Sequence, residues 1–121
     1  MSNRILVVDD EVNIVKLLES RLTANGYTVI TAYNGREALD KVKQERADLI
    51  ILDLMLPDID GYEVLRLLRL EEDYKEVPII MLTGCGQMND IKKGIEGGAV
   101  SYIAKPFKPN VLLGIVRGLV G

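Results

Sequence analysis

The stretch Ile50–Pro57, IILDLMLP, places one carboxylate, that of Asp53, inside an otherwise apolar run. The run has the length of a β-strand, and it is almost continuously apolar rather than alternating. Strands covered on both faces in a parallel sheet show this pattern. The stretch therefore predicts a buried strand that leads to an acid, in a sheet that needs helices on both faces.

The rest of the chain repeats this arrangement. Apolar runs of strand length are found at Ile5–Val8, Tyr27–Ala32, Leu49–Leu52, Val77–Leu82 and Val100–Ala104. Between them, apolar residues recur with helical spacing. These helical patterns are Val12, Val15, Leu18 and Leu22; Ala38, Leu39 and Val42; Val64, Leu65 and Leu68; a weaker one in residues 87–96; and residues 110–120. Strict alternation of five strands with five helices predicts an α/β fold with a parallel sheet and right-handed crossovers.

Length and composition narrow the possible functions. The chain has 121 residues, which fits a single domain, and a formal net charge of -3, which gives no reason to expect direct binding of nucleic acid. It has one cysteine, Cys85, and no histidine, so an internal disulfide and the usual Cys/His zinc sites are excluded. No secretory signal or membrane-length apolar stretch is present, and we expect a cytoplasmic domain without membrane contact.

Polar residues follow the apolar runs, where an open α/β sheet binds its ligands. Each residue alone has an ordinary structural explanation, such as helix capping or a solvent-exposed lysine. Together they predict a site at one edge of the sheet. The residues are Asp9, Asp10 and Glu11 after the first run, Asp53 after the third, Thr83 after the fourth and Lys105 after the fifth.

Several carboxylates in one pocket favour a bound cation. Two ionised carboxylates ~4 Å apart repel by about 4 kcal/mol at an effective dielectric constant of ~20. Only a few oxygen ligands are available, which suits Mg²⁺ better than Ca²⁺, and the acids do not have EF-hand spacing. Asp9 and Asp10 are the candidate metal ligands.

The same residues suggest phosphoryl transfer. A cation, the ammonium of Lys105 and the hydroxyl of Thr83 are suited to hold the oxygens of a phosphoryl group. A carboxylate can act as the nucleophile and form an acyl phosphate. Asp53 is the candidate acceptor.

With these residues, the chain resembles the CheY-like receiver domain of two-component response regulators. The resemblance spans essentially the whole chain and rests on segments in the family's order and spacing. The segments are VVDDE (7–11), LIILDLMLPDIDGYEVL (49–65), VPIIMLTG (77–84) and SYIAKPF (101–107). It implies a flavodoxin-like three-layer sandwich, with a parallel sheet of strand order 2-1-3-4-5 flanked by five helices, and a single receiver domain over residues 1–121.

The resemblance also implies roles for individual residues. Asp53 would be the phosphoacceptor and a metal ligand, with Thr83 and Lys105 on the phosphoryl oxygens. Mg²⁺ would be bound directly by Asp10, through water by Asp9 and through the backbone carbonyl of Met55. Further matches are Tyr102, at the position of the family's switch aromatic residue, and a cis peptide bond at Lys105-Pro106. The turn at residues 58–61 would open the third helix, with Gly61 free to adopt a positive φ.

The implied function is a phosphorylation-dependent switch rather than an enzyme with an external substrate. Its activities would be limited to Mg²⁺-dependent self-phosphorylation and self-dephosphorylation on Asp53. The donor would be a phosphohistidine of a partner kinase or phosphotransfer protein, because this chain has no histidine. The output would pass through the predicted fourth helix, fifth strand and fifth helix to an output domain, a partner or a second copy. The chain would be either a stand-alone receiver or the N-terminal module of a longer regulator.

Two departures from the family's usual pattern lie after the conserved hydroxyl residue, at Gly84, and before the switch aromatic residue, where residues 98–101 (GAVS) lack the acid or two that family members often have. A glycine replaces the alanine common after the conserved hydroxyl residue, so we expect a more open path to Asp53. Cys85 is interpreted as a small loop residue rather than a redox centre, because no second thiol is present.

The C-terminal third contains two glycine-rich segments. Gly94, Gly97 and Gly98 lie near the end of the predicted fourth helix, and each glycine there costs about 1 kcal/mol, which predicts a weakly stable element. In the predicted fifth helix, the residues on one face are Asn110, Gly114, Arg117, Gly118 and Gly121. A wide apolar surface covers the rest of that helix, part of which packs on the sheet and part of which is a candidate docking surface.

Three alternative functions remain to be compared. A phosphatase of the haloacid dehalogenase type would need an acid two residues after its nucleophile, where this chain has Met55. A flavin or dinucleotide site would need a phosphate loop after the first strand, where this chain has acids. A non-phosphorylated pseudo-receiver scaffold stays possible, although all the pocket residues are present.

Overall fold

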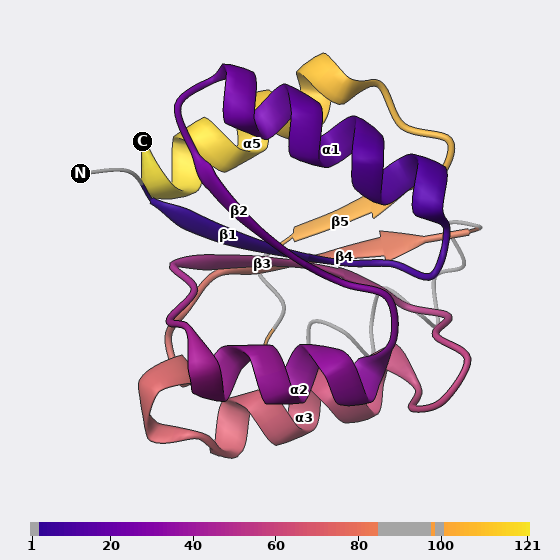
Figure 1. Ribbon diagram of the computed structural model, residues 1–121, viewed down its shortest axis with the longest axis vertical. Helices are drawn as coiled ribbons and strands as arrows, with labels where there is room; N and C mark the ends of the chain where they lie inside the picture. The colour runs from indigo at the N-terminus through magenta and orange to yellow at the C-terminus, as the bar shows by residue number, and fades with distance from the viewer. Residues whose placement is uncertain (1–2, 85–97, 99–100) are drawn as a thin grey trace.

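The protein folds around one parallel sheet with helices on both sides (Figure 1). This computed structural model describes residues 3–84, 98 and 101–121. The strands are β1 (Arg4–Val8), β2 (Thr28–Ala32), β3 (Leu49–Asp53), β4 (Ile79–Thr83) and β5 (Ser101–Ala104), in the order β2-β1-β3-β4-β5. Every neighbouring pair is parallel, which confirms the expected sheet and strand order.

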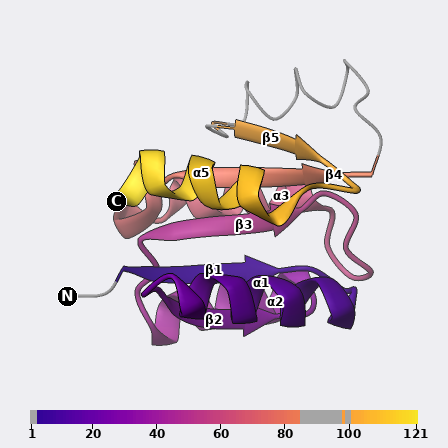
Figure 2. The same ribbon diagram turned by 90° about the horizontal axis from the view of Figure 1, so that it is seen from above.

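Four α-helices and a short 3-10 helix occupy the described part of the chain. The helices are α1 (Val12–Ala24), α2 (Gly35–Gln44), α3 (Gly61–Leu70), η1 (Glu72–Tyr74) and α5 (Pro109–Val120). The predicted fourth helix, with Gly94 and Gly97, lies outside the described residues, as does Cys85. All strand arrows point the same way (Figure 2). Helix α1 packs against β1 and β2.

The alternation of side chains along the strands builds two hydrophobic cores. In β1, Ile5 and Val7 face α1 and α5, whereas Leu6 and Val8 face α2 and α3. All five residues of β3 and all five of β4 are buried, as expected for the central strands of a sheet covered on both faces. These strands provide a rigid frame whose carboxyl ends carry the candidate site.

Asp53 is the last residue of β3 rather than a residue beyond its end. The strand continues one position past the apolar run, and Asp53 pairs in register with Leu82 of β4. Thr83 is likewise the last residue of β4. The backbone ladder of the sheet therefore holds both residues in place.

The turn before α3 is formed as expected, with Asp60 opening the helix, but Asp58 has another role than predicted. Asp60 is the N-cap of α3, and its carboxylate accepts a hydrogen bond from Tyr62 N at 2.7 Å. The carboxylate of Asp58 instead accepts hydrogen bonds from Gly35 N at 2.8 Å and Arg36 N at 2.9 Å, at the start of α2. Although desolvation opposes them, these bonds lower the pKa of Asp58. Asp58 thus ties the loop after β3 to α2.

The prediction of a positive φ at Gly61 is wrong. The described residues with positive φ are Gly26, Gly98 and Gly121, whereas Gly61 is the first residue of α3. A Cβ at Gly61 would lie 2.5 Å from the carbonyl oxygen of Asp53 and 2.7 Å from Leu54 Cα. Glycine is required here because two segments of backbone approach closely, not because the backbone is left-handed.

The C-terminal segment agrees with the sequence in three respects. The Lys105-Pro106 peptide bond is cis. Helix α5 buries Leu112, Leu113 and Val116 against the sheet. Its glycine face is exposed, with no described atom within 4 Å of a Cβ built at Gly114 or Gly118.

The described helices include none that is both long and apolar enough to cross a membrane.

Candidate functional site

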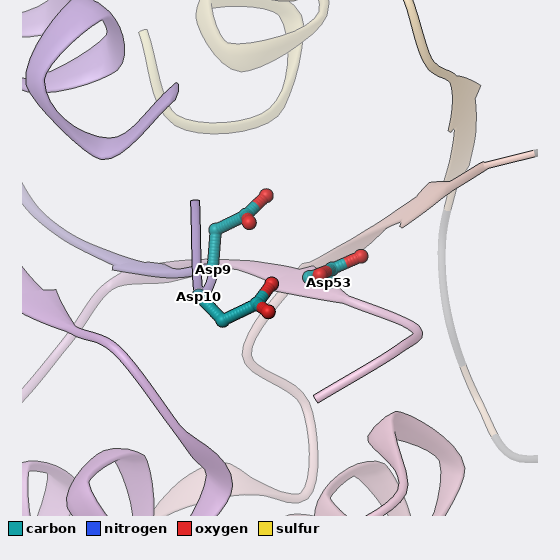
Figure 3. Close-up of side chains that lie close together, drawn as sticks. All are labelled: Asp9, Asp10 and Asp53. Carbon is teal, nitrogen blue, oxygen red and sulfur yellow. The ribbon is translucent and has the colours of Figure 1, made fainter. Parts of the chain in front are cut away.

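Three carboxylates converge at the carboxyl ends of β1 and β3 (Figure 3). Asp9 and Asp10 follow β1 directly, and Asp53 ends β3, which is the neighbour of β1 in the sheet. One ligand oxygen from each carboxylate lies within 4.8 Å of those of the other two. Asp9 and Asp53 are buried, whereas Asp10 is exposed. The topology of the sheet therefore assembles the acids that the sequence separates.

Asp9 is the most enclosed of the three acids. Its backbone N–H donates to Ala32 O at 3.1 Å, and its residue surface is 0% exposed. Its Oδ1 accepts a hydrogen bond from Glu11 N at 2.9 Å. Its Oδ2 lies 2.8 Å from Lys105 Nζ as an ion pair but has no hydrogen-bond partner of suitable geometry among the described residues. The ammonium of Lys105 is therefore the charge that compensates this buried oxygen.

The carboxylate of Asp53 lies at the floor of the site and is only 3% exposed at the level of the residue. Burial raises its pKa from 3.8 to about 6, and repulsion from Asp9 adds to the rise. Attraction to Lys105 and a hydrogen bond from Met55 N, at 3.4 Å from Oδ1, oppose it. Without a cation, the site therefore disfavours the ionised form that a nucleophile requires.

Lys105 reaches three acids at once. Its Nζ lies 2.8 Å from Asp9 Oδ2, 3.2 Å from Glu11 Oε1 and 3.4 Å from Asp53 Oδ1. Burial by itself would lower the pKa of the ammonium, but these acids raise it above its ordinary value. The backbone N–H of Lys105 donates to Thr83 O at 2.6 Å, which places the lysine beside the end of β4. Lys105 is therefore a fixed positive charge within the acidic cluster.

A solvent-accessible cavity of about 340 Å³ opens above Asp53. The exposed Asp10 and Met55 contribute to its rim, together with Gly84. The remaining lining residues are Glu11, Asp53 and Lys105. The Asp53 carboxylate therefore lines a cavity that is open to solvent and lies beside a lysine ammonium.

Comparison with known proteins identifies this arrangement. Residues 5–117 match the family model of the response regulator receiver domain. The chain belongs to the receiver-domain family. It is therefore a response regulator receiver domain of two-component signalling, with the CheY-like flavodoxin fold.

Individual relatives of this receiver domain include transcriptional regulators. It is 50% identical over 117 residues to the probable transcriptional regulator ycf27 of Porphyra purpurea, covering 97% of this chain and 47% of that protein. It is 46% identical over 120 residues to the alkaline phosphatase synthesis transcriptional regulatory protein PhoP of Bacillus subtilis, covering 99% and 49%. The chain thus spans about half the length of these relatives.

Among solved structures, the chemotaxis protein CheY4 of Vibrio cholerae superposes on this receiver domain with a TM-score of 0.95. The two sequences are 35% identical, and the match covers 99% of this chain and 100% of that one. The similarity therefore extends over the complete fold.

The structure brings together most of the site residues that the sequence singled out: Met55 lines the cavity, whereas Thr83 is buried at the end of β4 and reaches the site through the bond of its backbone carbonyl with Lys105. Asp9, Asp10 and Asp53 form one cluster, and Lys105 contacts two of them. The ligand assignments themselves stay predictions. Sequence reasoning placed Glu11 at this edge of the sheet but gave it no role, although its side chain contacts Lys105 across 94 positions of the chain.

The site of the receiver domain fits a small hard cation. Carboxylate oxygens are the ligands that Mg²⁺ prefers, and the exposed Asp10 leaves room for the waters that this ion retains. The buried Asp9 and Asp53 share the single ammonium of Lys105, so added positive charge at the cluster would compensate them further.

The raised pKa of Asp53 predicts how stability depends on pH. Folded metal-free protein binds a proton at Asp53 more tightly than the unfolded chain does, since the pKa rises from 3.8 to about 6. Protonation of Asp53 therefore stabilises the folded protein. This stabilisation is fully present below the pKa that Asp53 has in the unfolded chain, and it is lost as the pH rises through its pKa in the folded protein. Asp53→Asn should therefore raise the free energy of unfolding at pH 7 by about 1 to 2 kcal/mol, less than the full shift implies because pocket water screens the charge.

Urea unfolding at pH 7 without Mg²⁺ measures this effect. Asp40→Asn, which removes an exposed carboxylate of α2, is the control and should change stability little. An Asp53→Asn variant no more stable than the wild type would contradict the expectation.

Proposed function

We propose that this receiver domain is a phosphorylation-dependent switch whose phosphoacceptor is Asp53. The observation that carries the proposal is the position of the Asp53 carboxylate, which ends a rigid central strand, faces an open cavity and lies 3.4 Å from Lys105 Nζ. A nucleophile held in this way needs little reorganisation before it reacts.

The proposed step is the transfer of a phosphoryl group between two proteins. An Asp53 carboxylate oxygen forms a bond to phosphorus while the phosphorus–nitrogen bond of a phosphohistidine breaks, and the imidazole leaves with a proton from solvent. Lys105 offsets negative charge on the phosphoryl oxygens, and the Thr83 hydroxyl donates to one of them. Hydrolysis of the acyl phosphate by water returns the free carboxylate of Asp53 and resets the switch.

The proposed ligands of Mg²⁺ are Asp10, Asp53 and the backbone carbonyl of Met55. Asp9 would bind the ion through a water molecule. Bound there, the ion would neutralise the mutual repulsion of the acids and the charge that develops on the phosphoryl oxygens. The 4.8 Å cluster of carboxylate oxygens supports this assignment.

The proposed partners follow from this chemistry. The 121 residues contain no histidine, so the proposed phosphohistidine donor lies outside them, on a histidine kinase or a histidine phosphotransfer protein. No external substrate is turned over, so the domain is not proposed to be an enzyme beyond its own phosphorylation and dephosphorylation. Because the relatives include regulators of transcription about twice as long, we infer that a DNA-binding output would lie in another domain or partner.

The proposed output surface includes β5 and α5. Strand β5 is at one edge of the sheet, and Tyr102 at its centre is half-buried against the core on the α2 and α3 side. Helix α5 exposes Gly118 and 54% of Val111. Inward movement of Thr83 toward a phosphoryl group would change the packing of Tyr102 and so alter this surface. A Gly118→Glu variant that assembles and signals normally would contradict the proposal that this surface of α5 carries the output.

Incubation with acetyl phosphate, with and without Mg²⁺, tests the proposed reaction. Intact-mass measurement should show the addition of one phosphoryl group that depends on Mg²⁺, and borohydride reduction with peptide mapping should place it on Asp53. Modification of another residue, or none, would contradict the assignment.

Gly84 is expected to affect how fast the phosphoryl group is exchanged. The residue is exposed on the rim of the cavity, and a Cβ built there meets no described atom within 4 Å, so alanine fits without strain. Its methyl group would narrow the approach to Asp53. Gly84→Ala should therefore slow dephosphorylation by about two- to tenfold, which corresponds to about 0.4 to 1.4 kcal/mol in the barrier.

The decay of phosphorylated protein over time measures this rate. Gly118→Ala, on the distant face of α5, is the control and should decay like the wild type. Equal rates for Gly84→Ala and the wild type would show that the rim position does not control access.

A further inference from the structure

Glu11 occupies a helix N-cap but does not cap the helix. It directly precedes α1 in an extended conformation, and its side chain makes no hydrogen bond to the first turn. Short side chains normally satisfy the free N–H groups at this position. The side chain of Glu11 instead extends across the cavity, where its Oε1 accepts a hydrogen bond from Lys105 Nζ at 3.2 Å.

The contact is positioned by two parts of the backbone. Glu11 N donates to Asp9 Oδ1 at 2.9 Å, which fixes the start of the Glu11 side chain beside the buried acid. Lys105 is fixed by its own backbone hydrogen bond to Thr83 O. The side chain of Lys105 is 14% exposed and that of Glu11 58% exposed, so Glu11 holds the ammonium from the solvent side of the site.

Three acids therefore share one ammonium, and Asp53 is the most distant of them. The Nζ to oxygen distances are 2.8 Å for Asp9, 3.2 Å for Glu11 and 3.4 Å for Asp53. A cation on the acid cluster would compensate Asp9 and reduce its need for Lys105. Glu11 lines the cavity, is not one of the three clustered acids that could hold a metal ion, and would keep its contact with Lys105.

We propose that Glu11 is a positioning residue that competes with a phosphoryl group on Asp53 for Lys105. The inference rests on the proposed function and extends it to the stability of the phosphorylated state. Phosphorylation places new acceptor oxygens beside Lys105, and the ammonium satisfies them at the expense of its contact with Glu11. Repulsion between the Glu11 carboxylate and the added negative charge acts in the same direction. Glu11 thus limits how strongly the site retains its phosphoryl group.

Beryllofluoride, which mimics a phosphoryl group on a carboxylate, tests this role without turnover. Its dissociation constant is measured by amide chemical shifts at saturating Mg²⁺, after the Mg²⁺ affinity of each variant has been determined separately. Glu11→Gln should bind beryllofluoride about two- to fivefold more tightly, the range expected for loss of a partly exposed ion pair. Glu11→Asp, whose shorter side chain keeps the charge but withdraws it from Lys105, should shift affinity in the same direction.

Glu19→Gln is the matched control. It removes one negative charge from the exposed face of the same helix, where Glu19 has no hydrogen bond or ion pair with the described residues, and it should bind like the wild type. Affinity in Glu11→Gln that is equal to or weaker than that of the wild type would overturn the inference, as would an Asp variant that behaves like the wild type. Absence of saturable binding in the wild type would instead refute the proposed function itself.

Discussion

Replacement of Asp53 by asparagine should abolish Mg²⁺-dependent phosphorylation by acetyl phosphate. The amide of asparagine lacks the anionic oxygen that forms the bond to phosphorus, and no other carboxylate combines burial at a strand end with a contact to Lys105 and an open cavity among the described residues. The rate of phosphoryl incorporation should fall by about a hundredfold or more, equivalent to about 3 kcal/mol or more in the barrier.

Loss of structure would not explain such a result. The metal-free Asp53→Asn variant is expected to be more stable than the wild type at neutral pH, because the raised pKa of Asp53 shows that its charge is unfavourable there. Asp40→Asn removes an exposed carboxylate of α2 and should be phosphorylated normally. Undiminished incorporation in Asp53→Asn would mean that another residue is the acceptor.

Gly61→Ala should be the most destabilising of the glycine substitutions considered for this protein. The new Cβ would lie 2.5 Å from Asp53 O and 2.7 Å from Leu54 Cα and O, closer than Cβ contacts in proteins allow. These are backbone atoms of a buried segment, and Gly61 N also donates to Leu54 O at 2.9 Å, so neither side can move easily. Relief of the clash must displace α3 or the end of β3. We expect this to lower the free energy of unfolding by about 3 kcal/mol or more.

Chemical denaturation measures this loss, and Gly118→Ala is the control. At Gly118 a Cβ meets no described atom within 4 Å and the residue is inside α5, so alanine should leave stability unchanged or raise it by about 0.5 to 1 kcal/mol. Because the clash lies against Asp53, the Gly61→Ala variant should also show weakened Mg²⁺ binding. A Gly61→Ala protein as stable as the wild type would refute the close approach.

The fold was largely predictable because its determinants are local. The apolar runs at Leu49–Leu52 and Val77–Leu82 are long enough and continuous enough to specify strands buried on both faces. Their bounds moved by one or two residues, since the backbone ladder extends to Asp53 and Thr83. The grouping of the site residues was also predictable, because the ends of parallel strands meet at one edge.

The features that were missed depend on contacts between distant segments. Gly61 was assigned a special φ from local turn chemistry, whereas its role comes from the backbone of Asp53 and Leu54. Asp58 was assigned to the helix that follows it, but it binds α2, more than twenty residues earlier. Glu11 contacts a lysine 94 positions away. Spacing along the chain carries no signal for such contacts, although the run of three acids marked Glu11 for inspection.

A titration of the wild-type protein with beryllofluoride in the presence of Mg²⁺ tests the central claim most directly. We expect saturable, Mg²⁺-dependent shifts of backbone amides at Thr83, Tyr102 and Lys105, since these residues link the site to β5. Asp53→Asn should show none of them. Absence of a saturable change in the wild type would contradict a phosphorylation switch and would favour an inert scaffold with the same fold.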